Sequence, residues 1–188
     1  MNGKVVLIGA GPGDPQLLTV RGKSYIGKAD CIVYDRLATS ELLAYAKKNC
    51  ECIYVGKENH HHTMKQDAIN ELLAEKASGN QLVVRLKGGD PYVFGRGGEE
   101  ALFLKSRGIS VEVVPGISSV IAALTDAGIP ITHRGISKGF QVVTAHSRKD
   151  QPADIDYSKI EHISSETKDK LSKIRPKTLA QASRIGGV

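Results

Sequence analysis

The sequence contains no tryptophan, and aromatic residues make up only 5% of its 188 positions. A chain with so few rings is poorly suited to stacking on unpaired bases, so the sequence predicts no nucleic-acid partner. No apolar run approaches the roughly 20 residues that a membrane-spanning helix needs. The first residues, Met1–Lys4, lead straight into an apolar run without a signal-peptide pattern, which predicts a cytoplasmic protein.

Cysteine is scarce, and Cys31, Cys50 and Cys52 lack the Cys-x-x-Cys spacing of zinc and redox motifs. We interpret them as reduced, structural residues of a reducing compartment. His60–His62 are three adjacent histidines whose side chains point in different directions on a regular backbone. No cysteine or carboxylate set completes a site with them, so the sequence predicts no metal.

The net charge is +6, but no dense block of Lys and Arg carries it. Two interpretations stay open: an acidic small molecule as partner, such as a phosphate or a polycarboxylate, or simply a solvated basic surface. The apolar content of 40% is enough for a globular core, and the length suits one sizeable domain with a short appendage.

Strand-like runs alternate with helix-like runs over the first 150 residues. This alternation predicts an α/β fold, with a mostly parallel sheet and helices on both faces. The expected strands are 5–8, 31–34, 53–55, 82–86, 111–114 and 140–144, and the expected helices are 18–28, 39–47, 64–77, 99–107 and 118–127.

The pattern changes near Asp150. Residues 151–154 read as a linker, and two short amphipathic runs follow at 164–174 and 178–185. The sequence therefore predicts two parts: an α/β domain over residues 1–150 and a helical C-terminal appendage over residues 151–188.

Two glycine-rich loops follow predicted strands, Gly9–Asp14 and Gly88–Glu100. Two further polar loops, Val114–Ser119 and Pro130–Gly135, follow later apolar runs. Glycine lets a ligand lie against bare backbone, and open α/β sheets bind ligands at the carboxyl ends of their strands. We therefore expect a single small-molecule cleft at that edge of the sheet.

Several alternatives stay open at this level. Gly9–Gly13 resembles a dinucleotide fingerprint with Asp35 as the ribose-binding acid, but its third glycine comes one residue early and Pro12 removes an N–H group. Arg96 could face a substrate carboxylate or pair with Glu99 or Glu100. The serines of Val114–Ser119 could simply cap a helix.

Five motifs stand in order between about Lys4 and Ser147: Val5–Thr19, Tyr34–Leu37, Gly88–Glu100, Val114–Ser119 and Pro130–Arg134. Together they resemble the tetrapyrrole methylases, which use S-adenosylmethionine. The uninterrupted run Gly88–Glu100 is most similar to the branch that C-methylates uroporphyrinogen III on the way to precorrin-2, sirohaem and corrinoids.

The resemblance implies roles for particular residues. It implies Asp35 as proton acceptor, Lys57 as proton donor, and a homodimer. It implies a cofactor site formed by Pro12, Gly88, Gly89, Asp90, Val93, Ser118 and Ser119. Because such a substrate is a polycarboxylate, arginines are candidate partners for it: Arg21, Arg36, Arg96 and Arg134.

The tail has a different likeness. Asp156–Ile160 and Arg175–Val188 resemble part of the C-terminal helical region of the glucose-inhibited-division-type tRNA uridine-modifying protein. The second half expected of a tetrapyrrole methylase, with its Met-Gly pair, is not visible, which suggests a fusion or a truncated gene. An alternative function follows: a non-catalytic remnant or interaction module whose helical tail docks tRNA or a protein.

Overall fold

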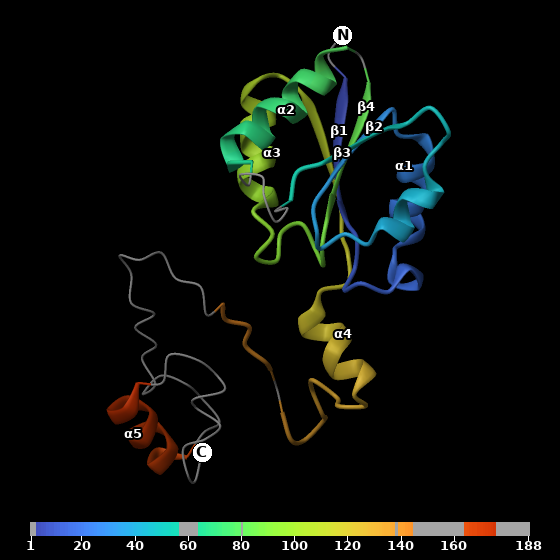
Figure 1. Cartoon of the computed structure of the whole chain (residues 1–188). Helices are drawn as coiled ribbons and strands as arrows, with labels where there is room; N and C mark the ends of the chain where they lie inside the picture. The colour runs from blue at the N-terminus through green and yellow to red at the C-terminus, as the bar shows by residue number, and fades with distance from the viewer. Residues whose placement is uncertain (1–2, 57–63, 80, 138, 145–163, 176–188) are drawn as a thin grey trace. The chain divides into compact units, whose positions relative to one another are not determined.

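Five parallel strands form one sheet in the order β3-β2-β4-β1-β5. The computed structural model describes residues 3–56, 64–79, 81–137, 139–144 and 164–175 (Figure 1). The strands are β1 (Lys4–Gly9), β2 (Cys31–Tyr34), β3 (Glu51–Tyr54), β4 (Leu82–Lys87) and β5 (Ser110–Val114). The α-helices are α1 (Val20–Lys28), α2 (Gln66–Ser78), α3 (Gly97–Ser106), α4 (Ser119–Asp126) and α5 (Ser165–Ile174), and the 3₁₀ helices are η1 (Pro15–Leu17) and η2 (Ser40–Tyr45).

Helices cover both faces of the sheet, as the alternation predicted (Figure 1). Successive side chains of a strand point to opposite faces. Val5 and Leu7 of β1 accordingly join the core beneath α2 and α3. Val6 and Ile8 join the core on the side of α1 and η2. All four side chains are fully buried, so both faces of this central strand stabilise the fold.

The sequence prediction was wrong at two elements. Residues 39–47 form a 3₁₀ helix over Ser40–Tyr45, and only Leu42 of that helix is buried, so little packing supports a longer α-helix. The predicted strand 140–144 does not form in the described structure. Phe140 and Val143 are exposed there, and a strand without a paired neighbour is not stable in water.

The chain divides into two compact units, Met1–Phe140 and Gln141–Val188. In the second unit, the side chain of Ser164 caps α5 by accepting a hydrogen bond from the Thr167 amide, and Leu171 is buried. The expected linker 151–154 and helix 178–185 lie outside the described residues, so the domain boundary at residue 150 stays a prediction. Among the described helices, none has the length and apolar character to cross a membrane.

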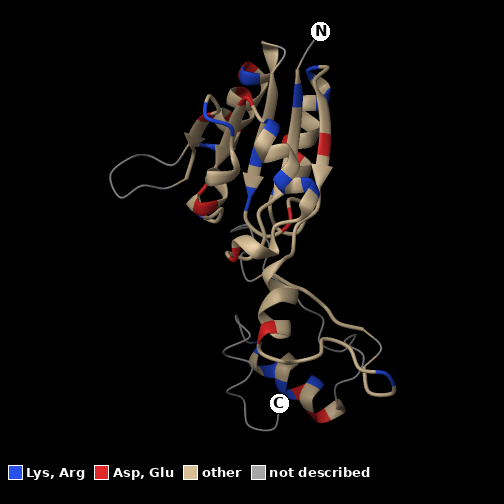
Figure 2. Ribbon diagram, turned by 90° about the vertical axis from the view of Figure 1, so that its right-hand side faces the viewer, with Lys and Arg blue, Asp and Glu red and all other residues tan. Residues whose placement is uncertain are grey.

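Basic and acidic side chains are intermixed over the sheet and its helices (Figure 2). Many form exposed pairs, such as Arg107 with Glu71 at 2.7 Å. On the β5 side, the Lys4 ammonium and the Tyr25 hydroxyl both donate hydrogen bonds to Glu112. Exposed pairs of this kind contribute little to stability, about 0–1 kcal/mol each.

Burial of Cys31 predicts that stability falls at alkaline pH. The Cys31 side chain has no exposed surface, and desolvation raises the pKa of its thiol from 9.0 to about 11. Above pH 9 the unfolded chain therefore loses this proton, whereas the folded chain keeps it up to about pH 11. The contribution of the Cys31 thiol to the free energy of unfolding is present below pH 9 and is lost as the pH rises through about 11. In urea unfolding between pH 8 and pH 11, Cys31→Ala should lose about 2 kcal/mol less stability than the parent chain.

The control for this prediction is Cys52→Ala, because Cys52 is exposed on β3. That variant should keep most of the parent's alkaline loss of stability, because it leaves the buried Cys31 thiol in place and removes only a neighbour that helps to raise the pKa of Cys50. Equal alkaline losses in Cys31→Ala and Cys52→Ala would contradict the assignment.

Candidate functional site at the carboxyl edge of the sheet

Three loops meet by direct backbone contact where β1, β4 and β5 end. The amides of Gly11 and Gly89 each donate a hydrogen bond to the other's carbonyl, at 3.3 and 2.7 Å. A Cβ atom added to Gly116 would lie 2.2 Å from the Gly89 carbonyl oxygen and 2.6 Å from Cα of Gly9. Only glycine permits such an approach, so the glycines of the three loops form a continuous backbone surface.

Asp90 joins two of these loops. One carboxylate oxygen accepts a hydrogen bond from the Tyr92 amide at 2.8 Å, and the other accepts from the Gly116 amide at 3.0 Å. Asp90 thus holds the loop after β4 against the loop after β5. Each oxygen retains a lone pair for a further donor.

The loop between β4 and α3 contains strained backbone. Phe94 and Arg96 have φ values of 52° and 57°, a region that non-glycine residues rarely adopt. The Gly97 amide donates to the Pro91 carbonyl at 2.9 Å, which closes the loop. Strain of this kind costs on the order of 1–3 kcal/mol per residue and is concentrated in proteins at functional sites.

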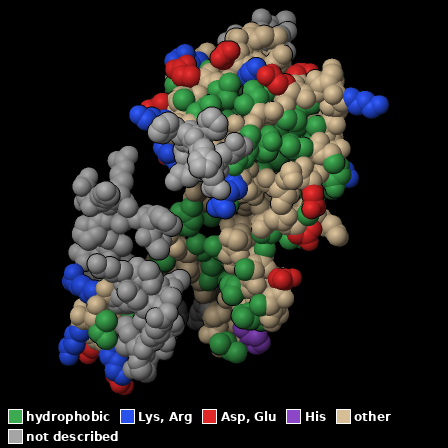
Figure 3. All heavy atoms as spheres, in the orientation of Figure 1, with side chains coloured by type: hydrophobic (Ala, Val, Ile, Leu, Met, Phe, Trp, Pro, Cys, Tyr) green, Lys and Arg blue, Asp and Glu red, His purple; other side chains and the backbone are tan. Residues whose placement is uncertain are grey.

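Apolar side chains are exposed around the same loops. Leu37, Tyr92, Val93 and Phe94 are 66%, 57%, 40% and 58% exposed. A Cβ atom on Gly88 would lie 2.5 Å from Cβ of Leu37, so the loop after β2 contacts the loop after β4. Hydrophobic side chains are also exposed elsewhere on the part of the chain that carries the sheet, and over α4 (Figure 3). Backbone polar groups beside exposed apolar side chains are typical of small-molecule sites.

The third loop leads into α4, where Ser118 occupies the N-cap position. Its side chain makes no capping hydrogen bond, although its carbonyl accepts from Ile121 and Ala122. Cα of Ser118 would lie 3.7 Å from a Cβ on Gly89, which places Ser118 beside the second loop. The interpretation that the Ser118 hydroxyl caps the helix is therefore wrong.

Asp35 lies at the carboxyl end of β2 and is fixed by two donors. One carboxylate oxygen accepts from Arg85 at 2.8 Å, and the other accepts from the Leu37 amide at 3.1 Å. The side chain is 25% exposed, so the carboxylate is oriented while part of it faces solvent. The arrangement allows Asp35 to accept a proton from a bound molecule.

The other sequence-predicted residues lie in several places. Pro12 is exposed in the loop after Gly11, Val93 follows Asp90 in a turn, and Ser119 is the exposed first residue of α4. Arg36 is exposed directly after Asp35. Lys57 and the histidines 60–62 lie outside the described residues, although Val55 just before them pairs with Tyr34 at the end of β2.

The remaining arginines are not linked to Asp35 by any contact in the described structure. Arg21 lies on α1 at the rim of a hollow of about 650 Å³ that Tyr25 and Glu112 also line. Arg134 is exposed in a turn closed by a bond from the His133 amide to Ser137. Arg96 pairs with Glu99 at 2.6 Å, so one of its two predicted partners is confirmed. The roles of these arginines toward substrate stay predictions.

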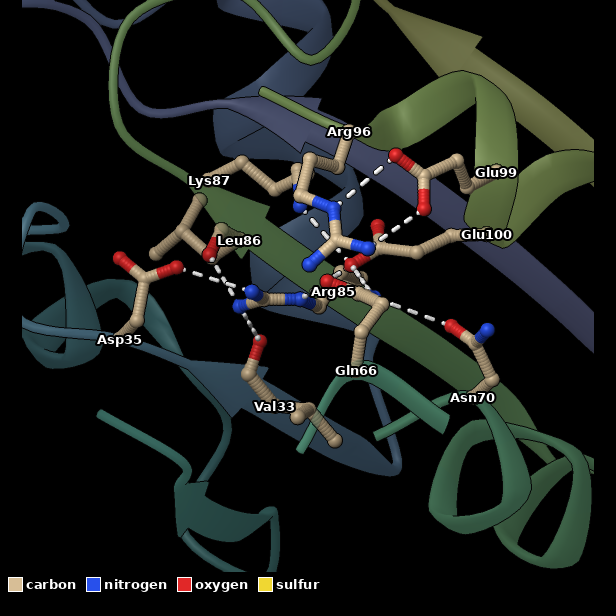
Figure 4. A network of polar contacts seen from close by, with 10 residues as sticks. All are labelled: Val33, Asp35, Gln66, Asn70, Arg85, Leu86, Lys87, Arg96, Glu99 and Glu100. Atoms are coloured by element: carbon tan, nitrogen blue, oxygen red, sulfur yellow. Dashed lines mark hydrogen bonds and ion pairs between the residues drawn. The ribbon is translucent and has the colours of Figure 1, made fainter. Parts of the chain in front are cut away.

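The sequence analysis missed a buried polar network beneath the site (Figure 4). Glu100 of α3 is fully buried, and one of its oxygens lies 2.9 Å from the Lys87 ammonium and 3.4 Å from Nε of Arg85. Gln66 of α2 donates to the same oxygen and to Asn70, at 3.0 Å each. Desolvation by burial and the nearby Arg85 lower the pKa of Lys87 below its usual range.

A sequence signal for this network existed. Arg85 and Lys87 are two cations on one face of a strand that is otherwise Val and Leu. Charges in a buried strand require partners, and Glu100 near the start of the next helix is one of the acids that follow this strand.

A parallel α/β sheet with glycine-lined loops at its carboxyl edge is the architecture of a small-molecule-binding protein. The sequence model of the family of tetrapyrrole (corrin/porphyrin) methylases matches residues 4–180 of this chain. The chain belongs to that family. The chain is 56% identical to a uroporphyrinogen-III C-methyltransferase of Methanocaldococcus jannaschii over 161 residues, which cover 85% of this chain and 66% of that protein.

Solved structures agree with this assignment. The uroporphyrin-III C-methyltransferase of Thermus thermophilus in complex with S-adenosylhomocysteine is 50% identical, with a TM-score of 0.62 over 73% of this chain and 57% of that chain. A cobalt precorrin-4 methyltransferase is 30% identical, with a TM-score of 0.69 over 80% of this chain and 61% of its own. The chain thus spans less than two thirds of the length of each of these relatives.

Proposed function

We propose that this chain is a uroporphyrinogen-III C-methyltransferase that uses S-adenosylmethionine as methyl donor and forms precorrin-2. The observation that carries the proposal is the meeting of Gly9, Gly89 and Gly116 at the carboxyl edge of the sheet. A relative of the same fold is known in complex with S-adenosylhomocysteine, the product form of that donor, which supports this choice of ligand over a dinucleotide.

The residues present fit a nucleoside of this kind. The Gly11 and Gly89 backbones lie side by side, and a Cβ on Gly13 would meet nothing within 4 Å, so the first loop is open on that side. When bound, the sulfonium supplies an electrophilic methyl carbon. Gly88, Gly89, Asp90 and Val93 would hold the nucleoside from the second loop, with Pro12, Ser118 and Ser119 from the other two.

The chain's own residues then position and deprotonate the substrate. Methyl transfer from a sulfonium is an in-line displacement that depends chiefly on near-attack geometry, so the reaction needs no metal. Asp35 accepts the proton that the ring system must shed after methylation, and Lys57 is the proposed proton donor. The arginines Arg21, Arg36, Arg96 and Arg134 would bind carboxylates of the tetrapyrrole.

We propose that the protein acts in the cytoplasm as a homodimer and binds no nucleic acid. The likeness of the tail to a tRNA uridine-modifying protein stays a prediction, as does the alternative of an interaction module. An RNA mobility shift that is lost on deleting residues 151–188 would favour that alternative.

Calorimetry with S-adenosylmethionine, S-adenosylhomocysteine and NAD tests the proposal. We expect both sulfur nucleosides to bind and NAD not to bind. Methyl transfer to uroporphyrinogen III should be measurable as the incorporation of a labelled methyl group. Binding of NAD alone would replace the proposal with a dehydrogenase.

A further inference from the structure

Glu100 is a fully buried carboxylate whose second oxygen, Oε2, has no hydrogen-bond partner among the described residues. An unsatisfied buried acceptor costs about 1–3 kcal/mol, more when it is charged. Replacing buried ionic groups by apolar residues of similar volume is often neutral or stabilising. Glu100 balances the buried cations Arg85 and Lys87, but its unsatisfied oxygen makes it a costly partner for that purpose alone.

The network connects Glu100 to Asp35 through a single guanidinium. Nε of Arg85 faces Glu100 at 3.4 Å, while Nη2 donates to Asp35 at 2.8 Å (Figure 4). The Arg85 side chain is only 4% exposed, and its Nη1 donates to the carbonyl of Leu86 at 3.0 Å. The guanidinium is therefore held in one orientation, and its charge is shared between two carboxylates.

We infer that Glu100 is a positioning residue for Asp35, acting through Arg85 to set the orientation and basicity of the proton-accepting carboxylate. This inference rests on the proposed function, because it assumes that Asp35 accepts the proton. Glu100 draws part of the Arg85 charge away from Asp35. A carboxylate that is less strongly neutralised by its partner is a better proton acceptor.

The charged groups around this pair balance one another. Arg85 and Lys87 of β4 face Glu100 of α3 and Asp35 at the end of β2. The uncharged Gln66 and Asn70 of α2 complete that side. At the start of α3, the exposed pair Arg96–Glu99 and nearby Asp67 add further charges. Removing one charged group should therefore change the basicity of Asp35 in a direction that follows from the charge removed.

Glu100→Gln tests the inference, because it keeps the shape of the side chain and removes one negative charge. Arg85 then pairs with Asp35 alone, which weakens Asp35 as a base. We expect the turnover number to fall about tenfold. The acidic limb of its pH profile should move to lower pH, while affinity for S-adenosylmethionine stays within about twofold. In the full chain, the carbon-13 resonance of the Asp35 carboxylate, assigned with Asp35→Asn, should also move.

Two variants make the test decisive. Glu71→Gln removes an exposed acid paired with Arg107 and should change neither the profile nor the resonance. Lys87→Met removes a cation from the same network, so it should move the acidic limb to higher pH, and it serves as the test if Glu100→Gln does not fold.

The inference is overturned if folded Glu100→Gln leaves both the Asp35 resonance and the pH profile unchanged. If the parent chain transfers no methyl group, the proposed function fails, and the resonance alone then decides whether Glu100 acts on Asp35.

Discussion

Asp35→Asn should lower the turnover number of methyl transfer by about 10²–10⁴-fold, the range typical for loss of a general base. Asparagine has one acceptor oxygen in place of two, so it can keep the hydrogen bond from the Leu37 amide or the one from Arg85, but not both. With the oxygen turned toward the Leu37 amide, the loop after β2 should keep its shape. Because the change removes proton acceptance and not the nucleoside site, affinity for S-adenosylmethionine should stay within about twofold.

The measurement combines single-turnover kinetics with calorimetry. Asp169→Asn is the matched control, because Asp169 is exposed on α5 in the other unit. It should retain full turnover. Equal turnover in Asp35→Asn and the parent chain would remove Asp35 from the mechanism.

Gly116→Ala should lower the free energy of unfolding by about 3 kcal/mol and abolish binding of S-adenosylmethionine. The added Cβ would lie 2.2 Å from the Gly89 oxygen and 2.6 Å from Cα of Gly9. Both neighbours are backbone atoms, so no flexible side chain can move aside. The loops after β1, β4 and β5 would have to separate, and their common surface would be lost.

Gly98→Ala is the control for this prediction. Gly98 lies in the first turn of α3, and a Cβ there meets nothing within 4 Å. Alanine in a helix is usually more favourable than glycine. We therefore expect the free energy of unfolding of Gly98→Ala to stay within about 0.5 kcal/mol of the parent value or to rise slightly. Full stability and full binding in Gly116→Ala would show that the three loops are not in close contact.

The sheet could be predicted because its strands are continuous apolar runs bounded by turns. Parallel strands buried on both faces read in this way, and 31–34 was predicted with the bounds of β2. The run 140–144 shows the limit of that signal. An apolar run predicts that a segment can pair, but not that a partner strand is present.

The site was predictable in part, for a related reason. Glycine-rich loops mark positions where backbone approaches backbone, and the contact of Gly9 with Gly116 is of this kind. The sequence does not show that Asp90 holds two loops together through the Gly116 amide. Nor does it show that Arg85 connects Asp35 to Glu100, because those residues are far apart along the chain.

The most direct test of the account is a crystal structure of this chain with S-adenosylhomocysteine. We expect the nucleoside to lie on the loops after β1, β4 and β5, in contact with Gly88, Gly89 and Asp90, with its sulfur directed toward the space beside Asp35. Density for the nucleoside elsewhere, for example in the hollow lined by Arg21 and Tyr25, would contradict the account.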